Sequence, residues 1–223
     1  MANMLLIIKE EVKQMVSGKT LDALIPPIIY VVGNSLFGLK TGIILALLTG
    51  IILGIFRLLK KQSIFYAFGG ILGIGIASAF AYFGDNASNY FLPKVITSGL
   101  LFLLALISVL IGRPLAAYVS HLARGWKLDW FFRPDIKPAY REVTIVWTAL
   151  FLMRMIVQLI LYRRGNVVEL GFANILLGFP ATFTVLILTL VYGMWRLKKL
   201  GGPGIEEFTE GKEAPWEGQK RGF

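Results

Sequence analysis

The stretch Gly42–Leu59, GIILALLTGIILGIFRLL, decides the fold of this chain. Its one charged residue is Arg57, close to its end. Crossing the hydrocarbon core of a bilayer as a helix takes about 20 mostly apolar residues. Backbone groups in lipid must be paired within the segment, which favours an α-helix. The stretch is therefore predicted to be a membrane-spanning helix.

Five further apolar runs of similar length predict an all-α, polytopic transmembrane bundle of about six helices. The predicted spans are 21–39, 42–59, 63–83, 95–112, 143–162 and 175–195. An amphipathic pattern before them predicts an interfacial helix over 1–20. The long loop 113–142 begins either with an interfacial helix or with a continuation of the fourth span. Residues 197–223, which are polar with little to bury, are expected to form a mobile tail.

The composition supports a membrane protein. Of the 223 residues, 56% are hydrophobic and only 16% are charged, whereas about 25% of residues are charged in soluble domains. The net charge of +10 fits basic loops beside anionic headgroups better than nucleic-acid binding. The chain has no cysteine, so disulfides and thiolate chemistry are excluded.

The distribution of Lys and Arg predicts the orientation. With a cytoplasmic N-terminus, the external segments hold only Lys40, Lys94, Arg163 and Arg164, and the loop 113–142 and the tail are rich in basic residues. Cytoplasmic segments carry this excess in membrane proteins. We therefore expect a multi-pass protein of a bacterial cytoplasmic (inner) membrane, with both termini cytoplasmic and with anionic lipids as partners.

Short matching strings suggest an inverted repeat of three helices plus three. FGGIL at 68–72 resembles FANIL at 172–176, and IPPII at 25–29 resembles LPKVI at 92–96. Because three is odd, the two halves would have opposite topology, as in many transporters. Chance matching of apolar strings is the alternative. Small residues repeat every four positions from Gly69 to Ala81 and could pack within one chain or between two copies.

Arg154, midway along the fifth predicted span, is the sharpest candidate for a functional residue. Placing an arginine there costs at least ~2.5–3.5 kcal/mol, and such residues are functional candidates by default. No Asp or Glu lies at comparable depth in the predicted spans. Arg154 is therefore expected either to bind an anion or phosphate headgroup or to bond the carbonyls of a broken helix. Pro180 is predicted to bend or interrupt the sixth span and so to free such carbonyls.

Four other residues complete the candidate ligand site. Gln158 lies four positions after Arg154, on the same helix face. Arg57 and Arg113 lie at cytoplasmic ends of spans, where they either extend to the interface or form the mouth of a pathway. Asn34, within the first span, is a ligand contact or an ordinary interhelical hydrogen bond.

The sequence contains few residues and motifs that are suited to catalysis. The single histidine, His121, has no second His or Cys near it to form a metal site. The HExxH, Walker A and GxSxG patterns are all missing. We therefore expect no enzyme activity, no cofactor and no metal.

Several strings together resemble a known group of proteins. They are Leu21-Asp22 with Pro26, 34–39, 56–63, 70–73, 90–93, 108–115, 177–180, and Tyr140 with Trp147, Phe151, Arg154 and Gln158. The chain resembles an uncharacterised bacterial family of polytopic membrane proteins, classed as a domain of unknown function. The string Ser-x-x-x-Gly-Arg-Pro-Leu at 108–115 is similar, more weakly, to the intracellular septation protein A group. The resemblance implies no activity.

These observations leave two main hypotheses. The first is a channel, carrier or lipid translocator for an anionic solute or phosphate-bearing lipid. The second is a non-transporting scaffold of cell-envelope or division machinery, suggested by the septation-protein likeness and the basic, aromatic loop 113–142. A membrane enzyme acting on lipids is the least favoured alternative.

Overall fold

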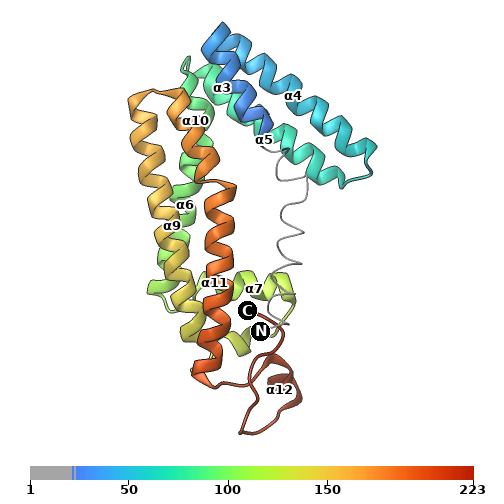
Figure 1. The fold of residues 1–223 in the computed structure, drawn as a ribbon, viewed down its shortest axis with the longest axis vertical. Helices are drawn as coiled ribbons and strands as arrows, with labels where there is room; N and C mark the ends of the chain where they lie inside the picture. The colour runs from blue at the N-terminus through green and yellow to red at the C-terminus, as the bar shows by residue number, and fades with distance from the viewer. Residues whose placement is uncertain (1–21, 23) are drawn as a thin grey trace. The chain divides into compact units, whose positions relative to one another are not determined.

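The computed structural model describes residue 22 and residues 24–223 of the chain, and this part is helical without strands (Figure 1). The interfacial helix predicted over residues 1–20 lies outside the described residues. The described chain forms two compact units. One contains the residues up to Thr97 together with Arg154–Pro180, and the other contains Ser98–Met153 and Ala181–Phe223. We call them the first and the second unit.

The first unit begins with three antiparallel helices, α3 (Ile25–Phe37), α4 (Leu39–Leu59) and α5 (Ile64–Phe83). Prolines occupy the first turn of α3 as expected, because the N–H groups there need no partner. Gly38, with φ of +84°, makes the reversal between α3 and α4. A Cβ on Gly50 would lie 2.5 Å from the side chain of Ile74, so this glycine lets α4 and α5 approach closely.

The rest of the first unit closes a core around aromatic residues. The 3-10 helix η1 (Ala87–Phe91) leads into α6 (Leu92–Leu110), and α10 (Val167–Leu176) packs against α3 and η1. Tyr30 of α3 is fully buried and stacks on Tyr90, with ring centroids 3.8 Å apart. Its hydroxyl donates to the carbonyl of Ala87 at 2.7 Å. These contacts fix η1 against α3.

The second unit surrounds another aromatic core. It contains α6 from Ser98 onward, α7 (Leu115–Arg124), α8 (Leu128–Phe131), the first part of α9 (Lys137–Arg164), most of α11 (Phe179–Leu200) and α12 (Ile205–Glu210). Trp130, Phe131 and Tyr140 are fully buried there. The Trp130 indole donates to the carbonyl of Pro203 at 2.9 Å. The segment after α11 is thereby tied to the segment before α9.

Four helical segments in the described residues are long and apolar enough to span a membrane, not the six that the sequence predicted. They are Leu39–Leu59, Ala87–Leu110, Lys137–Arg164 and Val167–Leu200. The first predicted span is cut to the 13 residues of α3, which ends before Gly38. α5 has 20 residues, and its stretch Ala67–Phe83 is an apolar helical segment shorter than the four named above. Large apolar side chains such as Leu36 and Ile52 remain exposed on these helices, as in proteins that face lipid.

The last predicted span is longer than expected and broken. The sequence placed its start at residue 175, but α10 already begins at Val167, capped by the side chain of Asn166. α10 ends at Leu176, and α11 restarts at Phe179 with Pro180 in its first turn. The predicted interruption of the last span is confirmed. Pro180 lies in the first turn of α11, so the break precedes this helix rather than falling inside it.

The predicted inverted repeat stays a prediction. The two matching strings FGGIL and FANIL occupy different positions in their helices. FGGIL lies in α5, which continues beyond residue 72, whereas FANIL ends α10 at residue 176. The small-residue stripe of α5 is also divided. Ala81 is fully buried in the first unit, whereas a Cβ on Gly69 or Gly73 would meet no atom within 4 Å.

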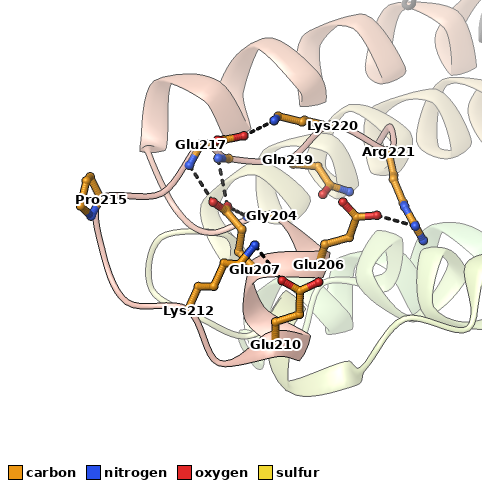
Figure 2. A pocket seen from close by; sticks show the side chains of 11 residues that line it. Gly204, Glu206, Glu207, Glu210, Lys212, Pro215, Glu217, Gln219, Lys220 and Arg221 are labelled. Atoms are coloured by element: carbon orange, nitrogen blue, oxygen red, sulfur yellow. Dashed lines mark hydrogen bonds and ion pairs between the residues drawn. The ribbon is translucent and has the colours of Figure 1, made fainter.

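The structure shows the segment 197–223 folded and packed, while its mobility stays a prediction. Residues 205–210 form α12, and Ile205 and Phe223 join the core of the second unit. The ring of Phe223 stacks on Tyr140, with centroids 4.2 Å apart. Figure 2 shows Glu207 facing the backbone of the returning chain at 217–218, to which its carboxylate is hydrogen-bonded. The few apolar residues are far apart in sequence, so their joint burial leaves no local pattern.

Candidate functional site

A row of polar side chains runs along one face of α9 in the first unit. Arg154, Gln158 and Tyr162 are spaced four residues apart, and that spacing places them above one another on a helix. Gln158 is only 4% exposed. Each of the three bonds a different partner segment. We call these three residues and their partners the polar seam.

The first contact of the polar seam joins α9 to the break between α10 and α11. The Nη2 group of Arg154 donates to the carbonyl oxygen of Gly178 at 2.6 Å. Gly178 lies between the two helices, and Pro180 has no N–H to continue the ladder across the gap. A Cβ on Gly178 would lie 2.5 Å from the carbonyl oxygen of Asn174, so only glycine fits this sharp turn.

The electrostatics of the break suit a cation. The last carbonyls of a helix lack partners within it and carry the negative end of the helix dipole. The guanidinium of Arg154 is half-buried and lies where the carbonyl of Gly178 needs a donor. The arginine therefore stabilises a backbone interruption that lipid alone would not tolerate.

The second contact is a buried amide relay. The Nε2 group of Gln158 donates to Oδ1 of Asn174 at 2.9 Å, and Nδ2 of Asn174 donates to the carbonyl of Leu170 at 2.8 Å. Asn174 is 5% exposed. The third contact is made by the hydroxyl of Tyr162, which donates to Oδ1 of Asn89 at 2.5 Å. The polar seam thus fastens α10 and η1 to α9.

The structure brings together only two of the five predicted ligand residues, Arg154 and Gln158. Asn34 lies near the end of α3, where its Cβ would be 3.0 Å from a Cβ on Gly42 of α4. It belongs to the α3–α4 contact. Arg113 is an exposed residue of the second unit, in the turn between α6 and α7.

Arg57 is not extended into solvent, as it would be in the first of the two alternatives that the sequence left open. It is only 5% exposed. A Cβ on Gly70 would lie 2.7 Å from its Nη1 atom, so the guanidinium occupies the space that a side chain on α5 would fill. The missing side chain at Gly70 explains why Arg57 turns inward rather than toward water.

Sequence reasoning missed Asn174, Tyr162 and Asn89. Extending the four-residue spacing from Arg154 and Gln158 to residue 162 would have found the tyrosine. Asn174 lies one position before the predicted sixth span, 175–195, and therefore was not among the polar residues considered within the spans. Asn89 lies in the polar connection between the predicted third and fourth spans.

The described residues show no group of three His, Asp or Glu side chains that could hold a metal ion. The chain's histidine, His121, places Nδ1 2.5 Å from the carbonyl oxygen of Trp126. This contact closes the turn after α7. The polar seam itself presents a guanidinium and side-chain amides as hydrogen-bond donors.

The described residues contain four apolar helical segments of spanning length, and one of them is broken and held by the polar seam. These features define the class of membrane-embedded helical proteins. The chain belongs to the family described as "Protein of unknown function (DUF3159)", which matches it over residues 16–199. No curated protein and no solved structure matches the chain. The weaker likeness to intracellular septation protein A therefore has no support from these comparisons.

Proposed function

We propose that this protein transports an anionic solute or a phosphate-bearing lipid, as a channel, carrier or lipid translocator. The observation that carries the proposal is the bond between Arg154 and the carbonyl of Gly178 at the α10–α11 break. Discontinuous helices in membranes are tolerated where the freed backbone is buried in protein or lines a cavity. In transporters, the ends of such helices form the substrate site.

The ligand class follows from the chemistry of Arg154. A guanidinium presents a planar fork of N–H groups that matches a carboxylate or phosphate at two points. Hydrogen bonds to a charged oxyanion are roughly twice as strong as bonds to a neutral carbonyl. An arriving anion would therefore compete with the carbonyl of Gly178 for the guanidinium. This exchange would loosen the break and couple ligand binding to movement of α10 relative to α9.

The proposed role is non-enzymatic and needs no cofactor. We place the protein in a bacterial cytoplasmic membrane, with the basic segment 113–142 and the segment 197–223 on the cytoplasmic side. This orientation is the same whether or not α3 and α5 cross the membrane. If both cross, the two additional crossings return the chain to the same side before α6. A second copy of the chain is a further candidate partner through the open part of α5 around Gly69 and Gly73. Nucleic acid is not among the proposed partners.

The test compares three purified proteins by native mass spectrometry: wild type, Arg154→Gln and Arg154→Lys. We expect wild type to retain an anionic lipid or solute that Arg154→Gln loses. Arg154→Lys, which keeps the charge but not the planar fork, should retain it partly. Flux of the identified compound in proteoliposomes should fall in the same order.

Arg163→Gln is the matched control, because Arg163 lies on the same helix and is exposed. It should behave as wild type. If Arg154→Gln folds and yet keeps both the ligand and the flux, Arg154 is only a bracket for the broken helix. If no form of the protein retains or moves an anion, the transport proposal fails.

A second candidate, a scaffold of the cell envelope, is favoured by a different observation. The segment 113–142 and the segment after α11 form one packed module around Trp130 and Tyr140. Such a module offers a firm platform for partner proteins. If this candidate is right, exposed substitutions such as Asp129→Arg abolish partner pull-down from membranes, whereas Arg154→Gln leaves it unchanged.

A further inference from the structure

The helix α7 follows a spanning-length segment almost at once. α6 ends at Leu110 and α7 begins at Leu115. Gly112, with φ of +70°, turns the chain between them, and the N–H of Leu115 donates to the Ser108 hydroxyl at 3.0 Å. α7 is thus a separate helix rather than a continuation of the span. A connection this short keeps the start of α7 at the membrane surface wherever α6 leaves the bilayer.

The direction and exposed face of α7 suit the plane of that surface. Within the second unit, α7 runs across the direction of α11 rather than along it (Figure 1). Its inner face is held by Ala117, which is fully buried. Its outer face shows Val119, 57% exposed, and Leu122, 82% exposed. A helix with one apolar face free and a polar remainder lies at the boundary of headgroups and acyl chains.

Exposed apolar side chains also lie at the end of α6, close to α7 along the chain. Leu110 and Ile111 are 74% and 65% exposed, and they directly precede the turn into α7. Only this short turn separates the exposed apolar end of the span from α7. Such an arrangement fits one continuous lipid boundary better than a separate protein-binding patch.

Positive charges flank this surface at both ends of the helix. Arg113 in the turn before α7 and Lys127 after it are exposed. Arg124, in the last turn, is partly used within the protein, since its guanidinium donates to the carbonyl of Arg221 and lies over the ring of Trp126. Exposed cations beside an apolar helix face attract anionic lipids, each by a charge interaction at the membrane surface.

We propose that the outer face of α7, formed by Val119 and Leu122 and flanked by Arg113 and Lys127, is a docking surface for anionic phospholipid headgroups. The occupant is the bilayer surface itself, because α7 follows the end of a spanning-length helix after a short turn and its apolar face is flanked by complementary charge. The proposal is independent of transport and of Arg154.

The test uses the fact that the chain has no cysteine. A nitroxide on Leu122→Cys reports depth through its accessibility to oxygen and to a water-soluble nickel complex. The full-length protein is measured in discs of phosphatidylcholine alone and of equal parts of phosphatidylcholine and phosphatidylglycerol. Glu213→Cys, at an exposed position of the C-terminal segment, is the control.

We expect the Leu122 label to be shielded from the nickel complex, more strongly with phosphatidylglycerol, and the Glu213 label to stay accessible in both discs. Arg113→Gln with Lys127→Gln should remove the difference between the two lipids and lower retention of phosphatidylglycerol on the order of tenfold. Equal nickel accessibility at the two positions would overturn the proposal. Shielding that occurs in native membranes but not in either disc would also overturn it, because a protein would then cover the face.

Discussion

The guanidinium of Arg154 donates a hydrogen bond to the carbonyl of Gly178, 24 residues away, at the point where α10 ends and α11 begins. This contact connects an arginine that is costly to place in a membrane with a backbone interruption that is costly for the same reason. Each feature offsets the cost of the other. The break and the arginine should therefore be tested as a pair.

Replacing Arg154 by Gln should lower the stability of the purified protein. A hydrogen bond to a charged group contributes about 1.5–3 kcal/mol, so we expect a loss on the order of 2 kcal/mol in the free energy of unfolding, visible as a lower melting temperature in detergent. Arg163→Gln, on the same helix but exposed, should change the melting temperature little. Equal melting temperatures for wild type and Arg154→Gln would show that the bond does not stabilise the break.

The amides of Gln158 and Asn174 should be energetically coupled. Both side chains are buried and they share one hydrogen bond. Interhelical hydrogen bonds in membrane proteins contribute about 0.6–2 kcal/mol. A double-mutant cycle with Gln158→Leu, Asn174→Leu and the double variant should give a coupling energy of about 1 kcal/mol. Strictly additive losses would mean that the pair is not a unit.

Much of the α9 side of the polar seam could be predicted from the sequence. The run 143–162 is apolar, and Arg154 and Gln158 stand out in it at helical spacing. The α10 side could not, because Asn174 belongs to a stretch between a basic pair and the next apolar run. Local hydropathy reads that stretch as a loop. The structure shows instead that this stretch forms α10, which packs against α3 and η1 in the first unit.

Local sequence patterns also fail to predict that the segment after α11 is folded. Ile205 and Phe223 are isolated in a polar sequence, so a local window gives them no core to join. The core that receives them is built by Trp130, Tyr140 and Gly193, which lie far away in sequence. Contacts between distant residues of this kind are invisible to periodicity and composition.

The space beside Gly193 of α11 should be too small for any side chain. A Cβ there would overlap the ring of Phe223, so Gly193→Ala should displace the aromatic ring and loosen the C-terminal segment. We expect faster proteolysis after α11 in Gly193→Ala and in Phe223→Ala. Gly201→Ala is unsuitable as a control because of its φ of +67°, whereas Ala214→Ser, at an exposed site, should leave proteolysis unchanged. Unaltered cleavage in both test variants would contradict the docked arrangement.

The C-terminal segment should loosen in acid through Glu207. Hydrogen bonds from the backbone N–H of Gly204, and then from those of Glu217 and Gly218, lower the pKa of this carboxyl below its ordinary value of 4.5. Because the folded pKa is the lower one, the stabilisation is present above pH 4.5 and is lost as the pH falls through the folded pKa. The protection of the amides of residues 217 and 218 against hydrogen exchange, relative to the intrinsic exchange rate at each pH, should fall over that range. Glu207→Gln should remove this pH dependence and Glu213→Gln should not. Identical pH profiles in wild type and Glu207→Gln would assign the effect to another group.

The orientation can be tested with single cysteines, since the wild-type chain has none. Asp129 and Glu213 lie in the segments proposed as cytoplasmic, and Asn166 lies in the turn between α9 and α10; all three are exposed. The excess of Lys and Arg near residues 129 and 213 should keep those segments inside. A membrane-impermeant maleimide applied to spheroplasts should therefore label Asn166→Cys at once, and should label Asp129→Cys and Glu213→Cys only after lysis. Labelling of Asp129→Cys in intact spheroplasts would reverse the proposed orientation, and opposite results at residues 129 and 213 would mean that α9 with α10–α11 does not cross the membrane twice.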